Sequence, residues 1–177
     1  MGTDFVKAAE TKVAVEKTQE DLRTLVRRYG ARGFGIRENW QTKRLEVELL
    51  LPNSPDSAGL DAAAFVPLRI PVDIDAVERR LRERIERKHI STTAKREQLH
   101  LQAQRTAWRI VYDLVDALLA SVVLGGRTVA EAFQGDIVVQ NERGEPERMA
   151  ELLARTGGAL PGGARMLVTS GPSLTDR

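Results

Sequence analysis

A single stretch, from Glu97 to Leu124, constrains most strongly what this chain can fold into. Its apolar residues recur at steps of three and four, which is the spacing of residues on one face of an α-helix. That face is formed by Ala103, Ala107, Ile110 or Val111, Leu114, Leu118 and Val122. An apolar face of this length has to be buried against other elements. The sequence therefore predicts a long central helix that ends at Gly125 and packs against the segments before it.

Three strands are predicted upstream of this helix. Residues 33–38 and 44–51 have the pattern of a hairpin, and the second strand alternates apolar and charged residues, which indicates one buried and one exposed face. Residues 66–72 alternate in the same way and form a third strand. Pro67 and Pro71 place this strand at an edge of the sheet, because proline has no N–H to donate to a neighbouring strand.

Two further helices are predicted beside the strands. Thr18 has the spacing to a downstream acid that is typical of a helix N-cap, and Gly30 ends the helix that it starts. Residues 12–16 alternate weakly and indicate a short edge strand before this helix. Asp75 has the same cap signature and starts a helix that runs to about His89.

The segment after the long helix is predicted to form a small module. It contains a short helix capped by Thr128, a strand at residues 136–140 and a last helix with Pro146 in its first turn.

Helices laid on one face of an antiparallel sheet define an α+β fold. We expect a three- to four-stranded antiparallel sheet covered on one face by an N-terminal helix and the long central helix, with a small C-terminal helix–strand–helix module. The expected domains are a flexible arm at residues 1–11, an α+β core domain at 12–126, the C-terminal module at 127–157 and a disordered tail at 158–177.

The composition limits the kinds of site that the protein can have and indicates its cellular location. The chain has no cysteine, which excludes disulfides and thiolate metal sites. No stretch approaches the roughly 18 consecutive apolar residues of a membrane helix, and none resembles a signal sequence. We therefore expect no membrane partner and a cytoplasmic location.

Positive charge is concentrated in one region, although the net charge of the chain is only +2. From Arg79 to Arg109 there are ten Lys or Arg against three Asp or Glu, a net charge of +7, so the remainder has a net charge of −5. Such asymmetry is typical of a protein that binds a polyanion. The alternative is a solvated helix face on which Glu83 and Glu86 pair with arginines three or four residues away.

Eleven residues are candidates for contact with nucleic acid. Trp40 lies at the predicted hairpin tip among cations, and this combination suits a single strand, whose bases stack and whose phosphates need neutralising. The alternative is that Trp40 folds back onto the sheet. The full set is Arg37, Trp40, Arg44, Arg79, Arg80, Arg82, Arg84, Arg87, Lys88, Lys95 and Arg96.

The sequence offers little for a catalytic or cofactor site. His89 and His100 lie on different predicted helices and have no thiol to work with, so neither a catalytic dyad nor a zinc site is indicated. The glycines lack the pattern of a phosphate-binding loop, and we expect no cofactor. We predict a protein that is not an enzyme. The alternative is a metal-dependent nuclease, although no spacing singles out a set of carboxylates.

Several segments carry a resemblance to a known family. They are the helix from Thr18 to Ala31, which ends in Arg-Tyr-Gly-Ala, then Phe34, the helix from Trp108 through Ala120, and residues 128–133. Across about residues 13–155 the chain resembles a family of small proteins encoded in phage and prophage genomes. The Arg-rich segment from Arg79 to Lys88 departs from the family pattern. The resemblance implies a phage or mobile-element setting and supplies no activity.

Charge and setting together lead to one expected function. We expect a nucleic-acid-binding protein of phage or mobile-element origin that forms homo-oligomers and contacts phosphates through its Arg-rich helical segment. The alternative is a protein-interaction module, either a structural component or a host-defence antagonist, whose arginines dock onto an acidic protein partner. Salt dependence distinguishes the two, because phosphate contacts release counterions.

Overall fold

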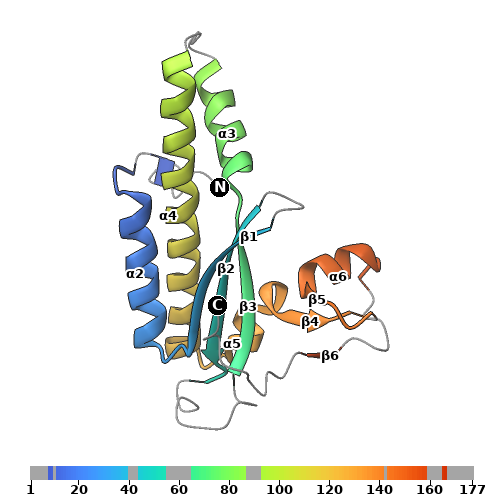
Figure 1. Ribbon diagram of the computed structural model, residues 1–177. Helices are drawn as coiled ribbons and strands as arrows, with labels where there is room; N and C mark the ends of the chain where they lie inside the picture. Colours follow the sequence, from blue (N-terminus) through green and yellow to red (C-terminus); the bar gives the residue numbers. More distant parts are fainter. Residues whose placement is uncertain are drawn as a thin grey trace, which may run out of the picture.

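Figure 1 shows a three-stranded antiparallel sheet beside a long helix, α4 (Thr93–Gly125), with a smaller module on the other side of the strands. The structure, a computed structural model, describes residues 8–9, 11–39, 44–54, 65–86, 93–141, 143–158 and 165–166. The fold is α+β, as the sequence predicts. No helix within these ranges has both the length and the apolar character needed to span a membrane.

The main sheet contains β1 (Gly33–Asn39), β2 (Arg44–Pro52) and β3 (Phe65–Val72), in that order across the sheet. Both pairings are antiparallel, which confirms the predicted hairpin and third strand. In the register, Val47 of β2 lies opposite Ile70 of β3. β3 is at an edge of this sheet, as its prolines predict.

α2 (Val15–Arg28) and α4 pack on one face of the sheet (Figure 1). This face is apolar because alternate residues of the strands point toward it. Its buried residues in β2 and β3 are Val47, Leu49, Leu51, Val66, Leu68, Ile70 and Val72. Leu22 and Val26 of α2 and Trp108 of α4 complete the core, and Trp108 is only 1% exposed.

The other face of the sheet is more covered than the alternation of β2 predicts. Glu46 and Phe65 point to that face, and both are buried. Arg69 on the same face donates a hydrogen bond to the Pro146 carbonyl of the C-terminal module at 3.5 Å. This face is therefore partly protected from solvent by a segment far away in the sequence.

The predicted strand at residues 12–16 and the predicted N-cap at Thr18 are both wrong. α2 begins at Val15, with Ala14 as its N-cap residue. Thr18 lies one turn inside the helix, where it is buried and its hydroxyl donates to the Ala14 carbonyl at 3.3 Å. Alternation over five residues is a weaker signal than the apolar face of a helix. Gly30 follows the helix with φ 93°, as predicted.

The buried face of α4 differs from the predicted one near its centre. Leu114 is 41% exposed, whereas Val115 is completely buried. The buried line consists of Ala103, Ala107, Val111, Val115, Leu119 and Val122. Most of these residues are four apart, which is slightly more than one turn of 3.6 residues. The line therefore winds slowly around α4, and Leu114 falls outside it.

The described part of the predicted flexible arm lies against α4. Ala8 and Ala9 are buried. The side-chain amide of Gln102 on α4 donates to the carbonyls of Ala9 and Thr11 at 2.9 and 3.0 Å. These contacts tie the start of the described chain to the centre of the molecule.

A second, smaller sheet forms the C-terminal module. Its strands are β4 (Val138–Gln140), flanked by β5 (Pro146–Arg148) and β6 (Arg165–Met166). Around it lie α5 (Val129–Ala132), the 3-10 helix η3 (Gln134–Asp136) and α6 (Met149–Arg155). β6 falls within the segment predicted as a disordered tail, where it pairs with β4. The remainder of the tail after Gly158 lies outside the described residues.

Of two local predictions for the C-terminal module, the helix cap at Thr128 is confirmed and the helical position of Pro146 is wrong. Thr128 caps α5 in a capping box with Glu131, as predicted. Pro146 belongs to β5, opposite Gln140, so its predicted place in the last helix is wrong. The Asn141 side chain accepts two backbone N–H groups and closes the turn between β4 and β5, which carries Pro146 into the strand.

Candidate nucleic-acid interface

α3 (Ile74–Glu86) and the first half of α4 form an arm that extends beyond the sheet (Figure 1). The 33 residues of α4 give it a length of about 50 Å at 1.5 Å per residue. β2, with nine residues, spans only about 30 Å. α4 therefore overhangs the sheet, and α3 runs antiparallel to the overhanging part. We call residues 74–109 the α3–α4 arm.

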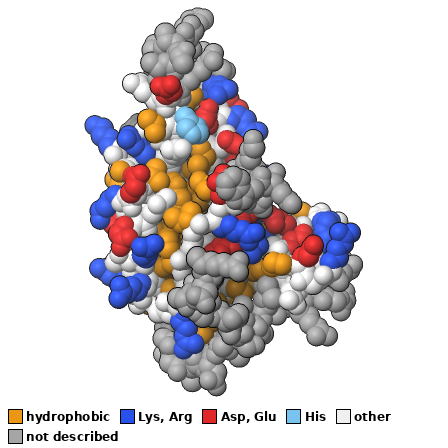
Figure 2. All heavy atoms as spheres, viewed as in Figure 1, with side chains coloured by type: hydrophobic (Ala, Val, Ile, Leu, Met, Phe, Trp, Pro, Cys, Tyr) orange, Lys and Arg blue, Asp and Glu red, His pale blue; other side chains and the backbone are white. Residues whose placement is uncertain are grey.

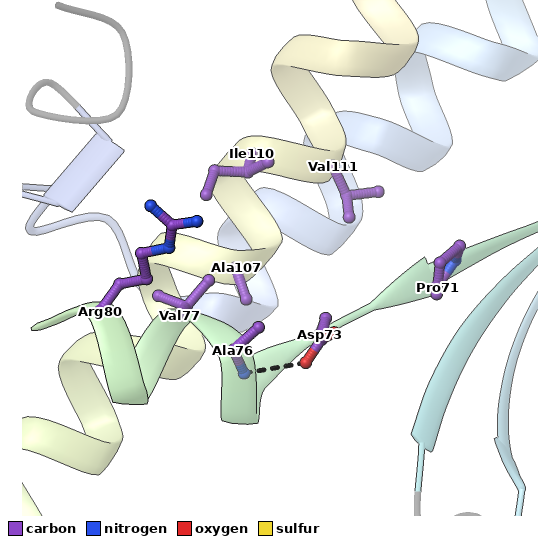
Figure 3. A pocket seen from close by; sticks show the side chains of 8 residues that line it. All are labelled: Pro71, Asp73, Ala76, Val77, Arg80, Ala107, Ile110 and Val111. Carbon is purple, nitrogen blue, oxygen red and sulfur yellow. Dashed lines mark hydrogen bonds between the residues drawn. The ribbon is translucent and has the colours of Figure 1, made fainter. Parts of the chain in front are cut away.

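A narrow apolar seam holds the two helices of the arm together. Val77 and Leu81 of α3 are buried in the same core as the alanines of α4. Asp73 caps α3, because its carboxylate accepts the N–H of Ala76 at 2.9 Å (Figure 3). The predicted cap residue, Asp75, is exposed instead, so that prediction is wrong by two residues.

A polar network joins the same helices at the surface of the arm. The Glu78 carboxylate on α3 lies 2.8 Å from Nδ1 of His100 on α4, and it accepts a hydrogen bond from Arg82 at 2.8 Å. The hydrogen bond with His100 lowers the pKa of Glu78; burial opposes this effect, and the Arg82 guanidinium adds to it. Glu78 is therefore ionised at neutral pH and neutralises Arg82.

The arginines of α3 differ in how available they are to a ligand. Arg82 is already paired with Glu78. Arg79 and Arg80 are exposed, and neither has an ion pair within the described part of the chain. The side chains of the other five predicted contact residues of the arm, Arg84, Arg87, Lys88, Lys95 and Arg96, lie outside the described residues.

Positive charge increases toward the end of the arm that lies furthest from the sheet. Along residues 74–83, three Asp or Glu balance three Arg. Residues 84–96 have five Lys or Arg against one Glu, a net charge of +4. Three of these cations belong to the end of α3 and the start of α4, which lie at the far end of the arm (Figure 1). By sequence, residues 74–83 of the arm are therefore net neutral, whereas residues 84–96 are net cationic.

An open apolar groove lies at the base of the arm, between α3, α4 and the end of β3 (Figure 3). Its volume is ≈ 320 Å³. The lining residues are Pro71, Asp73, Ala76, Val77, Arg80, Ala107, Ile110 and Val111. Asp73 caps α3, whereas Arg80, at one end of the groove, has no ion pair with any residue that the structure describes. The groove thus combines an apolar floor with one available cation.

The basic residues predicted at the hairpin differ in whether they are already paired with a carboxylate. Arg37 pairs with Glu48 at 3.5 Å, and the same carboxylate oxygen accepts from Arg69 at 3.0 Å. Sequence reasoning did not identify these pairings, because they depend on how all three strands align in the sheet. Trp40 lies outside the described residues. Arg37 is therefore less available to a phosphate than predicted.

Arg44 lies near the base of the arm. It is exposed and has no ion pair in the described ranges. Its neighbour Leu45 is paired with Val72, two residues before α3 begins at Ile74. Arg44 is therefore at the end of the sheet from which the arm leaves.

The remaining surface in view has mixed charge. Figure 2 shows Lys and Arg side chains interspersed with Asp and Glu on both sides of a vertical band of hydrophobic side chains. Several cations are paired one helical turn away, such as Lys17 with Asp21 at 2.6 Å and Arg109 with Asp113 at 2.8 Å. On the described part of this face, no large field of a single sign is present.

The described residues include no group of three or more His, Asp or Glu side chains that could hold a metal ion. His100 is occupied by Glu78 and by Gln104, whose amide nitrogen lies 3.1 Å from Nε2. The described residues therefore offer no set of metal ligands of the kind that a metal-dependent nuclease uses.

Comparison with models of protein families, with curated proteins and with solved structures finds no match to this chain. The resemblance to phage and prophage proteins therefore stays a prediction from the segments that carry it. What the protein does has to be inferred from the geometry and charge of the arm.

Proposed function

We propose that this protein binds nucleic acid without catalysing a reaction, and that it contacts phosphates through the α3–α4 arm. One observation carries the proposal: the arm projects from the sheet with a neutral base and a net charge of +4 in residues 84–96. A projecting cationic end can reach phosphates while the acidic remainder of the protein stays at a distance. Arg79 and Arg80 add two exposed cations on α3, and neither has an ion pair among the described residues.

Contacts of this kind give affinity rather than sequence recognition. Arginine binds a phosphate through two parallel N–H groups, which fixes orientation as well as charge. Phosphate contacts position a protein on nucleic acid and carry no direct information about the bases. Arg44 lies at the end of the sheet from which the arm leaves. A nucleic-acid strand bound along the arm would therefore also pass Arg44.

The proposal is tested by fluorescence anisotropy with single-stranded and duplex oligonucleotides between roughly 50 and 200 mM salt. The arm variant is Arg79→Gln, Arg80→Gln and Arg84→Gln. The matched control is Arg27→Gln, Arg28→Gln and Arg127→Gln, which removes the same charge from exposed arginines at the end of α2 and just after α4, away from the arm (Figure 1).

We expect the arm variant to lose about tenfold or more in affinity and to reduce the salt slope by about 1 for each lost phosphate contact. The control should stay within about twofold of the wild type, because a contact depends on position and not on net charge. Equal losses in both variants, or no binding at about 50 mM salt, would overturn the proposal.

A protein-interaction role is the second candidate, and the groove in Figure 3 favours it. An apolar floor beside the unpaired Arg80 fits a partner segment in which an apolar side chain lies next to a carboxylate. Such a contact loses little affinity with added salt, because apolar burial is not screened. Absence of oligonucleotide binding at low salt would leave this role in place of the first.

A further inference from the structure

We infer that β1 is the surface through which two copies of this chain pair, edge to edge, into one six-stranded sheet. The inference starts from the two edges of the main sheet, which differ in their ability to accept another strand. The inference does not depend on the proposed function, because the arm consists of α3 and α4 and the pairing surface is β1.

The β3 edge is closed to a new strand. Pro67 and Pro71 offer no N–H groups, so two of the eight residues of β3 cannot donate to a neighbour. An isolated bridge between Leu68 and Ile137 also brings the C-terminal module against this strand. Natural sheets protect their edges by such prolines and by covering segments.

The β1 edge has neither of these protections among the residues that the structure describes. Within the described ranges β1 pairs only with β2, and its seven residues include neither proline nor lysine. Ile36 is 41% exposed, and it lies on the core face of the sheet because it is opposite Val47. A seven-residue edge strand with an exposed apolar side chain is a template for pairing with another strand.

β1 is complementary to itself in one antiparallel register. If Gly35 of each copy lies on the two-fold axis, Phe34 of one copy is opposite Ile36 of the other, and this pair occurs twice. Aromatic and β-branched residues in this relation stabilise neighbouring strands. Both side chains point to the core face, so the apolar face continues from one copy into the next.

Charge complementarity supports the same register. The Arg23 guanidinium lies 5.1 Å from the centroid of the Phe34 ring, and Glu38 has no ion pair within the described part of the chain. In this register Glu38 of the second copy is diagonal to Phe34, close to Arg23. An axis at Ile36 would place Phe34 opposite Glu38, and an axis at Arg37 would place two arginines opposite each other.

The wild-type chain contains no cysteine, so a single introduced thiol reports on this contact. Gly35→Cys fits the fold, because an added Cβ meets its nearest neighbours, atoms of Glu48, at 3.9 Å. Two such residues on the axis would be about 5 Å apart, within reach of a disulfide. Glu38→Cys is the matched control, because its two copies would be about 20 Å apart along the strands.

We expect the wild type to sediment at twice the chain mass of 19.6 kDa and Ile36→Lys to sediment at 19.6 kDa. Under mild oxidation, Gly35→Cys should form a disulfide dimer and Glu38→Cys should not. A monomeric wild type, or cross-linking of Glu38→Cys as efficient as that of Gly35→Cys, would overturn the inference. If circular dichroism shows that Ile36→Lys is unfolded, the comparison of the two cysteine variants alone tests the inference.

Discussion

The Glu78 carboxylate on α3 and the His100 ring on α4 meet at 2.8 Å, although they are 22 residues apart in the sequence. This contact lies at the surface of the arm, beside an apolar seam that is only a few residues wide. It links the two helices, while Arg79 and Arg80 form no ion pair among the residues that the structure describes.

Glu78→Gln should lower the free energy of unfolding by about 1 kcal/mol, because it weakens charge-assisted hydrogen bonds that are partly screened by solvent. Urea denaturation followed by circular dichroism measures the change. Glu83→Gln, on the same helix and exposed without an ion pair, is the control and should change stability by less than about 0.5 kcal/mol. Equal effects of the two substitutions would mean that the link between the helices contributes nothing.

The contribution of Glu78 should depend on pH in the acid range. Its pKa in the folded protein is below the usual value of 4.5, because of the hydrogen bond with His100. The folded state therefore binds the proton less readily than the unfolded state, and the stabilisation is present above pH 4.5. It is lost as the pH falls through the folded pKa. Urea titrations of wild type and Glu78→Gln should converge below pH 4.5, and a difference that stayed constant down to the acid limit would contradict this.

Leu114 and Val115 are adjacent on α4, but truncation of the two side chains should lower the stability by different amounts. Val115→Ala should cost about 2 kcal/mol of stability, since Val115 is completely buried. Leu114→Ala should cost less than about 1 kcal/mol although more atoms are removed, because Leu114 is 41% exposed. Thermal or urea unfolding of both variants measures this, and a larger loss for Leu114→Ala would place the predicted face of α4 in the core after all.

Arg79 and Arg82 should differ in their effect on nucleic-acid binding. Arg79→Gln removes an unpaired cation and should reduce the salt slope of binding by about 1. The double substitution Glu78→Gln with Arg82→Gln removes a neutral ion pair and should leave the slope unchanged. Anisotropy titrations at several salt concentrations make the comparison. A slope lowered as much by the double substitution as by Arg79→Gln would show that the ion pair does not shield Arg82.

The strands were predictable from the sequence because their signals are local. Alternation in β2 and β3 determines which residues point to the core, and the prolines of β3 indicate an edge strand. The hairpin follows from the short connection between β1 and β2. None of these features depends on what lies on the other side of the core.

The details that the sequence did not reveal depend on tertiary contacts. Thr18 has the pattern of a cap, yet the apolar face of α2 extends further toward the N-terminus and places this residue inside the helix. The line of buried residues on α4 winds because its neighbours change along its length, which excludes Leu114. The pairing of Glu48 with Arg69 and that of Glu78 with His100 join elements whose relative placement no local pattern specifies.

The two prolines of β3 have a consequence for how far this protein can assemble. A filament in which subunits join by adding strands to one sheet needs two sheet edges on every subunit that can accept a new strand, one for each neighbour. Here one border of the main sheet lacks donors at positions 67 and 71 and is partly occupied by the C-terminal module. Strand addition to the main sheet would therefore stop after two copies have paired, because the β3 border does not offer a second site of the same kind.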